Sequence, residues 1–289
     1  MGPETFIGFW ALACGQVVGI LYFYGILRGN NMNFYLKGAL FYVYILLAAE
    51  LLVVFDAGIL VTALLFSVLP AIYFFRHEKM CRSTILSIAA FSLAATFLWE
   101  AIAYANGVWY ELSSFGVRVM GQFPVETLFW HFAYVIMLVT AYEYFFDDRK
   151  SQPITWDYKT QWLSVFVGGT LIFALVYLLA LRTFYIPHAY AVMLIGTAMS
   201  LAIAAAISHQ YSLAIFKKAL GFALFMLPIG IIHEFVSLLN VHWVFANTSQ
   251  YIHTVVLFGE TVPVEKFVFL FLIPFWVVSV YELYLDDAE

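Results

Sequence analysis

Among the glutamates that stand inside otherwise apolar stretches of the sequence, four form two similar pairs: Glu100 with Glu126, and Glu234 with Glu265. An ionised carboxylate in hydrocarbon costs several kcal/mol, so such groups face a protein interior or a polar cavity and mark functional sites by default. Carboxyls that share one dry site cannot all ionise, because desolvation and mutual repulsion raise their pKa values. A carboxyl that stays protonated there is a general acid, and an ionised neighbour can stabilise a cation or take the proton back. This pair of roles suits an isoprenoid substrate: protonation of a double bond, ring closure through a carbocation, and deprotonation.

The placement of the four acids separates a local explanation from a functional one. Glu126 and Glu265 each follow a proline by two residues, in the first turn of an apolar segment, where the helix dipole favours an anion. A helix-start role would explain these two without any chemistry. Glu100 and Glu234 lie at the C-terminal ends of apolar segments, where an anion is disfavoured. We therefore predict that all four converge as catalytic acids in one chamber beneath a single membrane face.

Aromatic side chains surround these acids. Their π-faces stabilise cations, although aromatic rings are also typical of the membrane interface. The residues predicted to bind substrate are Tyr104, Trp109, Phe129, Trp130, His233 and Trp243. The nearby histidines form neither a His-x3-His nor a Glu-x-x-His pair, so we expect no metal site. The sequence has no glycine-rich phosphate loop and no aspartate-rich diphosphate motif, so we expect no magnesium-dependent prenyl transfer.

The composition places these residues in an integral membrane protein. Of the 289 residues, 64% are hydrophobic and 11% are charged, whereas soluble domains are about half apolar and about a quarter charged. The lipid bilayer is therefore an expected partner. The net charge of -5 and the lack of a basic patch indicate no nucleic-acid partner, and two cysteines, Cys14 and Cys81, do not make a disulfide framework. The N-terminus lacks the basic region of a signal peptide, so the first apolar run is expected to be a retained helix.

Apolar runs of about 20 residues, the length that crosses a bilayer, predict an all-α fold with about nine transmembrane helices. The continuous run 38–75 is divided at Asp56-Ala57-Gly58, because a single helix of that length would be about 57 Å long against a hydrocarbon core of about 30 Å. The predicted spans are 5–27, 38–55, 57–75, 84–105, 122–146, 162–181, 188–208, 219–240 and 262–285.

The lysines and arginines indicate the orientation of these helices. With the N-terminus outside, ten of them fall in connectors on the inner side and two, Arg118 and Arg182, in connectors on the outer side. Such a bias is typical of cytoplasmic connectors. The sequence therefore predicts a multi-pass protein of the cell membrane, with an outer N-terminus and a cytoplasmic C-terminus.

Matching spacings predict an internal repeat. Nine residues from a glutamate to a tryptophan and eighteen from a proline to a tyrosine recur in both halves, in the pairs Glu100–Trp109, Glu234–Trp243, Pro124–Tyr142 and Pro263–Tyr281. Each copy has four helices, an even number, so the copies are expected to form a parallel tandem repeat, with one extra N-terminal helix. We divide the chain into the N-terminal helix and first inner loop (1–37), a first repeat (38–150) with a carboxylate hairpin at 99–148, and a second repeat (151–289) with a carboxylate hairpin at 233–287.

The motifs of the first hairpin carry a resemblance to a known family. They are Trp99-Glu100, then Gly107-Val108-Trp109-Tyr110, then Gly-x-x-Pro-x-Glu ending at Glu126. In these motifs the chain resembles the integral-membrane lycopene cyclases, the heterodimeric or fused carotenoid cyclases, which also carry a tandem duplication. The similarity covers 99–148 and, more weakly, 233–287. It implies cofactor-free, acid-catalysed ring closure of a linear carotene end group, with a hydrophobic isoprenoid or carotenoid as substrate, and it gives the acid roles to Glu100, Glu126, Glu234 and Glu265.

The chain departs from the family's pattern at four positions. The family's helix start has two adjacent acids after the proline, and here the second is Thr127 in one copy and Lys266 in the other. Glu100 stands where aspartate is common, and His233 stands where a tryptophan precedes the acid. We expect Lys266 to form an ion pair with Glu265 and to silence that acid. The chain is then a divergent member, in which the first copy holds the active acid or the substrate is another isoprenoid.

Two other functions fit the same sequence. Intramembrane acids on a parallel repeat are also found in small-molecule or proton-coupled transporters, and a protein with the cyclase fold can bind a carotenoid or lipid without turning it over. The pigment content of a lycopene-producing host separates the three, through new rings, uptake without a pigment change, or an unreacted polyene that copurifies. The sequence leaves open the substrate, the ring type and whether the chain forms a homo-oligomer.

Overall fold

The computed structural model describes residues 32–77, 82–147, 158–181, 184–208, 212–245, 247–257 and 259–284. Within these ranges the chain is mostly helical, and eight helices are long and apolar enough to cross a membrane. They coincide with the second to ninth predicted spans. The first predicted span, 5–27, lies outside the described residues.

The helices begin and end close to the limits of the apolar runs. In chain order they are α2 (Met32–Val54), α3 (Ile59–Ala63), α4 (Leu69–His77), α5 (Arg82–Asn106), α6 (Val125–Phe145), α7 (Tyr158–Val176), α8 (Ala189–Ser208), α9 (Leu213–Leu239) and α10 (Val264–Tyr284). A π-helical turn, η1 (Leu64–Val68), joins α3 to α4 within one span, and a second, η3 (Tyr177–Leu181), ends α7. At η1 the Tyr44 hydroxyl donates to the carbonyl of Leu65 at 2.7 Å, so a polar group of the widened turn is satisfied by a neighbouring helix.

The division of the run 38–75 into two helices is confirmed. Asp56, between α2 and α3, has a φ of 46°, a left-handed conformation that L-residues do not propagate. Asn240 Nδ2 donates to the carbonyls of Leu52 and Ala57 at 3.0 and 3.1 Å. His242 Nε2 also donates to Ala57, at 2.8 Å. Side chains at the end of α9 and in the connector that follows it therefore hold the break between α2 and α3 through hydrogen bonds to its backbone carbonyls.

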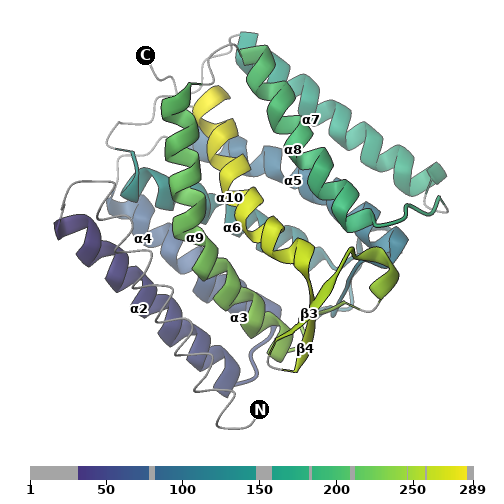
Figure 1. The fold of residues 1–289 in the computed structure, drawn as a ribbon, viewed down its shortest axis with the longest axis horizontal. Helices are drawn as coiled ribbons and strands as arrows, with labels where there is room; N and C mark the ends of the chain where they lie inside the picture. Colours follow the sequence, from purple (N-terminus) through teal and green to yellow (C-terminus); the bar gives the residue numbers. More distant parts are fainter. Residues whose placement is uncertain are drawn as a thin grey trace.

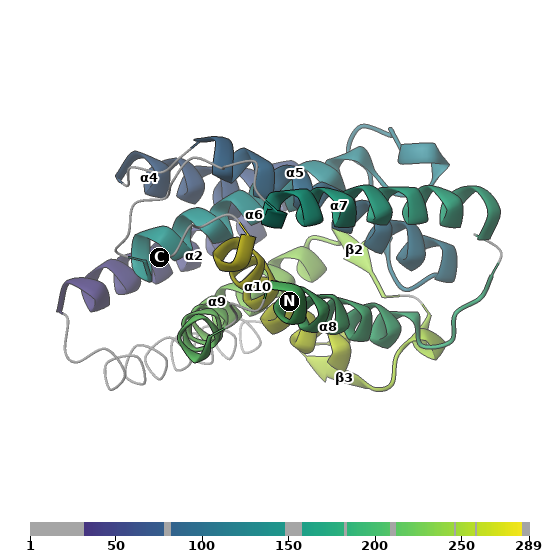
Figure 2. The same cartoon turned by 90° about the horizontal axis from the view of Figure 1, so that it is seen from above.

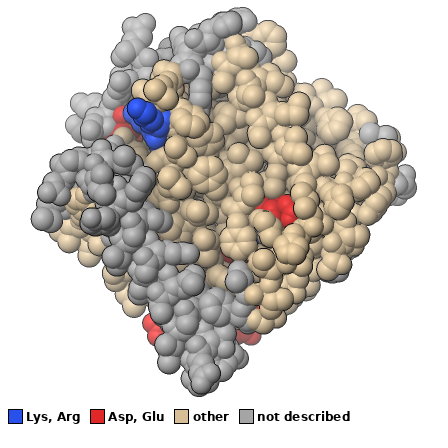
Figure 3. Space-filling view, viewed as in Figure 1, with Lys and Arg blue, Asp and Glu red and all other residues tan. Residues whose placement is uncertain are grey.

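The spans form a bundle in two layers, with the helices running roughly side by side (Figure 1). Seen from above (Figure 2), α4, α5 and α7 lie in one layer and α8, α9 and α10 in the other; α6 packs against α4 and α5 and also reaches α10. Buried aromatic rings fill the bundle at the end where α2 begins, among them Phe34, Phe41, Phe74, Phe145 and Phe225. The face drawn in Figure 3 carries few charged side chains, as expected of a surface in contact with lipid.

The connectors at the other end of the bundle contain short strands, a feature that the expected all-α fold did not include. Strand β1 (Tyr110–Glu111) pairs antiparallel with β2 (Trp243–Val244), and β3 (Thr254–Leu257) pairs with β4 (Glu260–Pro263) in a hairpin visible in Figure 1. Two 3-10 turns, η2 (Val119–Gly121) and η4 (Thr248–Gln250), complete the connectors. The β1–β2 pair joins the α5–α6 connector to the α9–α10 connector, so the described parts of the two connectors meet over the same end of the bundle.

Candidate active site

Two of the predicted acids are held by tryptophans that fold back from the connectors. Glu100, near the end of α5, is 1% exposed and accepts a hydrogen bond from Trp109 Nε1 at 3.1 Å. Glu234, near the end of α9, is 4% exposed and accepts one from Trp243 Nε1 at 2.9 Å. The nine-residue spacing seen twice in the sequence thus corresponds to the same contact made twice: the helix ends, the chain turns, and the indole returns to the acid.

Lys266 forms an ion pair with a different acid from the one expected. Its Nζ lies 2.9 Å from Glu234 Oε2, and it also lies over the rings of Trp243 and Phe269, at 4.8 and 5.0 Å from their centres. The expected pair with Glu265 was wrong, because adjacent residues of an α-helix project about 100° apart. Lys266 points towards α9, so the lysine neutralises Glu234.

Glu126 and Glu265 anchor the connectors of their own hairpins. Glu126 Oε1 accepts hydrogen bonds from the amide of Phe115 at 2.7 Å and from Ser113 Oγ at 3.0 Å. Glu265 accepts one from the amide of Ile252. Both glutamates are buried, and each holds a connector backbone 11 or 13 residues upstream. The structure therefore places them as a second matched pair, distinct from Glu100 and Glu234.

A small cavity of about 30 Å³ lies where the joined connectors cover the helices. One water needs roughly 10–15 Å³, so the cavity has room for about two. Its polar lining is Glu100, Glu111, His131 and Lys266, and its aromatic lining is Trp109, Trp130, Tyr190, Trp243, Phe245 and Phe269. The structure therefore brings together four of the residues predicted from the sequence: Glu100, Trp109, Trp130 and Trp243.

The other predicted residues lie around this cavity. Among the described residues, its lining does not include Glu126, Glu234, Glu265, Tyr104, Phe129 or His233. Glu234 is linked to it through Lys266. The Tyr104 hydroxyl accepts a hydrogen bond from the amide of Glu111 at 2.7 Å, and Phe129 is 47% exposed on α6. Tyr104 thus supports strand β1, while Phe129 faces away from the acids.

The two histidines of this region have different surroundings. His233 Nε2 accepts a hydrogen bond from Trp130 Nε1 at 3.1 Å, and the two rings stack with their centres 5.1 Å apart. His131 Nδ1 donates to the carbonyl of Thr127 at 3.0 Å, which leaves its Nε2 for the cavity. His233 therefore fixes the orientation of Trp130. Within the ranges the structure describes, no group of three or more His, Cys, Asp or Glu side chains could hold a metal ion.

Glu111 is the site residue that the sequence analysis missed. It lies on β1, is 6% exposed, and its Oε2 accepts a hydrogen bond from Thr127 Oγ1. Thr127, in the first turn of α6, therefore faces a carboxyl that strand β1 supplies. Burial raises the pKa of Glu111 from 4.5 to about 7, against the opposing effect of the Thr127 hydrogen bond.

The raised pKa of Glu111 makes the stability of the fold depend on pH. An acid whose pKa is higher in the folded state contributes stability that is complete below its unfolded pKa and is lost as the pH rises through its folded pKa. For Glu111 the window is pH 4.5 to about 7, and the full loss is about 3 kcal/mol. Thermal unfolding in detergent micelles should therefore show wild type losing stability across this window relative to Glu111→Gln, which cannot ionise. Parallel pH profiles for the two proteins would show that Glu111 is not the titrating group.

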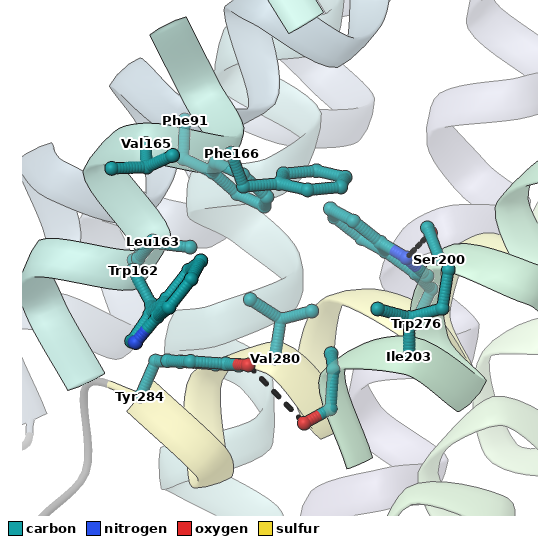
Figure 4. A pocket seen from close by; sticks show the side chains of 11 residues that line it. Phe91, Trp162, Leu163, Val165, Phe166, Ser200, Ile203, Trp276, Val280 and Tyr284 are labelled. Carbon is teal, nitrogen blue, oxygen red and sulfur yellow. Dashed lines mark hydrogen bonds between the residues drawn. The ribbon is translucent and has the colours of Figure 1, made fainter. Parts of the chain in front are cut away.

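A second cavity, of about 170 Å³, lies between α5, α7, α8 and α10, nearer the end of the bundle opposite the connectors (Figure 4). Phe91 and Trp276 form part of its wall and stack on each other, with ring centres 5.1 Å apart and an interplanar angle of 8°. Its polar groups are already paired: Trp276 Nε1 donates to Ser200 Oγ at 2.9 Å, and the Tyr284 hydroxyl donates to the carbonyl of Ala204 at 3.2 Å. A cavity with apolar walls and satisfied polar groups suits a hydrocarbon chain.

Comparisons with family models, with curated proteins and with solved structures found no match to this chain. The fold itself defines the class: the described chain has eight helices of the length and composition that cross a membrane, as expected of a multi-pass membrane protein.

Proposed function

We propose that this protein is a membrane cyclase of the lycopene cyclase type, which closes a ring on a linear isoprenoid end group by proton transfer, without redox chemistry or a cofactor. The observation that carries this proposal is the meeting of two buried carboxyls, Glu100 and Glu111, at one small cavity walled by tryptophans. Carboxyls buried around the same small space favour a shared proton, which provides an acid and a base side by side.

In this proposal Glu100 is the proton donor and Glu111 the acceptor. Since the pKa of Glu111 is about 7, a substantial share of it is ionised at neutral pH and can accept a proton. The proton of Glu100 adds to the terminal double bond, and the electrons of a second double bond in the end group close the carbon–carbon bond of the ring. A proton then leaves the cyclic cation for Glu111 and returns to Glu100 within the cavity. The product is an isomer of the substrate, so no electron or group donor is needed.

The aromatic walls and the ion pair have separate roles in this scheme. The rings of Trp109, Trp130 and Trp243 surround the space where positive charge develops, and ring faces stabilise cations by about 0.5–2 kcal/mol each. The ion pair with Lys266 balances the charge of Glu234, so Glu234 is not one of the reacting acids. The first half of the chain then supplies the reacting carboxyls, as expected from the departures in the second half.

An isoprenoid end group is larger than the cavity, so the walls must move apart to admit it. The connectors that cover the site are joined by two strand pairs, Tyr110 with Val244 and Glu111 with Trp243. Two further hydrogen bonds join them, from the amide of Leu112 to the carbonyl of His242 and from the Tyr251 hydroxyl to the carbonyl of Val108. Local opening breaks only this small set of contacts. We propose that the β1–β2 pair separates when substrate binds.

The apolar cavity of Figure 4 supports an isoprenoid rather than a polar substrate. Trp276 follows Lys266 by ten residues on α10, about 15 Å along the helix. Helices α5 and α10 also contact each other nearer the acids, where the ring centres of Trp99 and Phe269 are 5.2 Å apart. Aromatic side chains of α5 and α10 thus continue from the carboxyl cavity to the apolar one. We propose that the chain behind the end group lies along this path.

We further propose the parallel repeat and the orientation predicted from the sequence. The repeat is supported by contacts that occur in matched positions: Trp109 with Glu100 and Trp243 with Glu234, and, at the far end, Tyr142 with Glu282 and Tyr281 with Glu143. The orientation, with the carboxyl site on the outer side of the cell membrane, is supported by the excess of lysine and arginine in connectors at the opposite end.

The test is expression of the full chain in a host that accumulates lycopene, with pigments separated by chromatography. We expect ring-containing carotenes of unchanged mass to replace the linear precursor. A protein that binds carotenoid without turnover would instead copurify with unreacted polyene, an alternative that the apolar cavity favours. Uptake of a small molecule with no pigment change would indicate a transporter. Either of these results would contradict the cyclase proposal.

A further inference from the structure

A groove of about 300 Å³ lies between α2 and α4, far from the carboxyl site. One of its lining residues, Tyr144, follows Glu126 by 18 residues on α6, about 27 Å along the helix. The groove is therefore at the opposite end of the bundle, and the proposed cyclisation does not use it.

The groove has buried aromatic walls and an exposed aliphatic rim. Phe41, Phe74 and Phe145 are at most 7% exposed, whereas Leu40 and Leu69 are 61% and 42% exposed. Both bounding helices belong to candidate membrane spans, so the rim lies at the depth of the lipid acyl chains. In the membrane, lipid acyl chains therefore surround the groove.

A lysine stands at the end of this groove. Lys37, on the second turn of α2, is half-buried and lies with its Nζ 4.3 Å over the ring of Tyr144. Within the part of the chain that the structure describes, the ion pairs involve Lys218 and Lys266 and not Lys37. The exposed Arg76 and His77 end α4 nearby, with the His77 ring 6.3 Å from that of Tyr144. The end of the groove is therefore cationic.

We propose that this groove is a binding site for an anionic phospholipid, with one acyl chain between α2 and α4 and the headgroup phosphate on Lys37. Long lysine side chains near helix ends extend to the interface, and basic pockets between transmembrane helices bind anionic headgroups. The charge at the rim selects an anionic over a zwitterionic lipid, and the apolar walls select an intact lipid over a free phosphate ester.

The test is titration of the delipidated full chain in detergent with phosphatidylglycerol, with bound lipid counted by native mass spectrometry. Lys37→Gln should weaken binding roughly fivefold or more, the ratio that corresponds to about 1 kcal/mol per lysine near a membrane surface. Lys37→Arg should retain binding, and Leu40→Trp should weaken it because the indole occupies the place of the acyl chain. The matched control is Lys217→Gln, which removes an exposed lysine at the start of α9 and should change the affinity less than twofold.

Three results would overturn the proposal. One is equal affinity for phosphatidylcholine and phosphatidylglycerol. Another is an equal loss in Lys37→Gln and Lys217→Gln. The third is binding of glycerophosphate as tight as that of the intact lipid. Since Leu40→Trp and Lys37→Arg keep the charge of the rim, they test the site even if Lys37→Gln does not fold.

Discussion

Glu100→Gln is expected to slow ring formation by roughly 10²–10⁴-fold, the usual contribution of a positioned general acid or base. Glutamine has nearly the same shape, and its carbonyl still accepts the hydrogen bond that Trp109 Nε1 donates. The site therefore loses a proton donor while its packing is kept. The measurement is the initial rate at which membranes that contain the variant convert a linear carotene to a cyclic product, at equal amounts of folded protein.

The control for this experiment is another glutamate on an apolar helix. Glu50 lies on α2 and is exposed, outside the lining of the carboxyl cavity. Glu50→Gln should retain the wild-type rate within about twofold, because it removes an intramembrane charge without touching the site. An equal loss in Glu50→Gln and Glu100→Gln would indicate that charge in the bundle, and not proton transfer at the cavity, determines the rate.

Glu126→Gln separates the cavity acids from the acids that the family resemblance emphasises. Glu126 holds the amide of Phe115 and the hydroxyl of Ser113, so its replacement should loosen the connector and lower the rate by less than Glu100→Gln does. Full activity of Glu100→Gln together with inactive Glu126→Gln and Glu265→Gln would contradict our assignment. The reacting acids would then be those at the helix starts.

The sequence was sufficient where one local rule determines the structure. Apolar run length predicted the described spans, and the length limit of a single span predicted the break at Asp56, which the structure confirms. The repeated spacing from Glu100 to Trp109 and from Glu234 to Trp243 corresponds to two equivalent hydrogen bonds. Each of these features depends on residues that are close in the chain.

The features that were not predicted depend on contacts between distant segments. Glu111 lies in a connector, outside the apolar runs, so no local pattern in the sequence indicates that it is buried. Its burial results from the pairing of β1 with β2, in which Glu111 lies opposite Trp243, 132 positions later in the chain. Lys266 was assigned to its neighbour in sequence, whereas helix geometry points it to Glu234 on another helix. The sequence offered one signal for Glu111, its place in the connector between Glu100 and Glu126.

Lys266→Met is expected to destabilise the fold by about 3–5 kcal/mol, the usual cost of removing one partner of a buried ion pair. The side chains of Lys266 and Glu234 are 12% and 6% exposed, with 2.9 Å between Nζ and Oε2. Methionine fills most of the lysine's volume, so the loss arises from the unpaired carboxylate of Glu234. The measurement is reversible unfolding in mixed micelles, with the exposed Lys217→Met as a control that should change the free energy of unfolding by less than about 0.5 kcal/mol.

The double variant Lys266→Met with Glu234→Gln tests the reason for that loss. Glutamine carries no charge, and its carbonyl keeps the hydrogen bond from Trp243 Nε1, so the double variant should recover most of the stability lost in Lys266→Met. Recovery is expected because a buried ion pair replaced as a unit by neutral groups is often close to neutral in free energy. A double variant as unstable as Lys266→Met would show that the lysine acts through its contacts with Trp243 and Phe269, and not through the charge of Glu234.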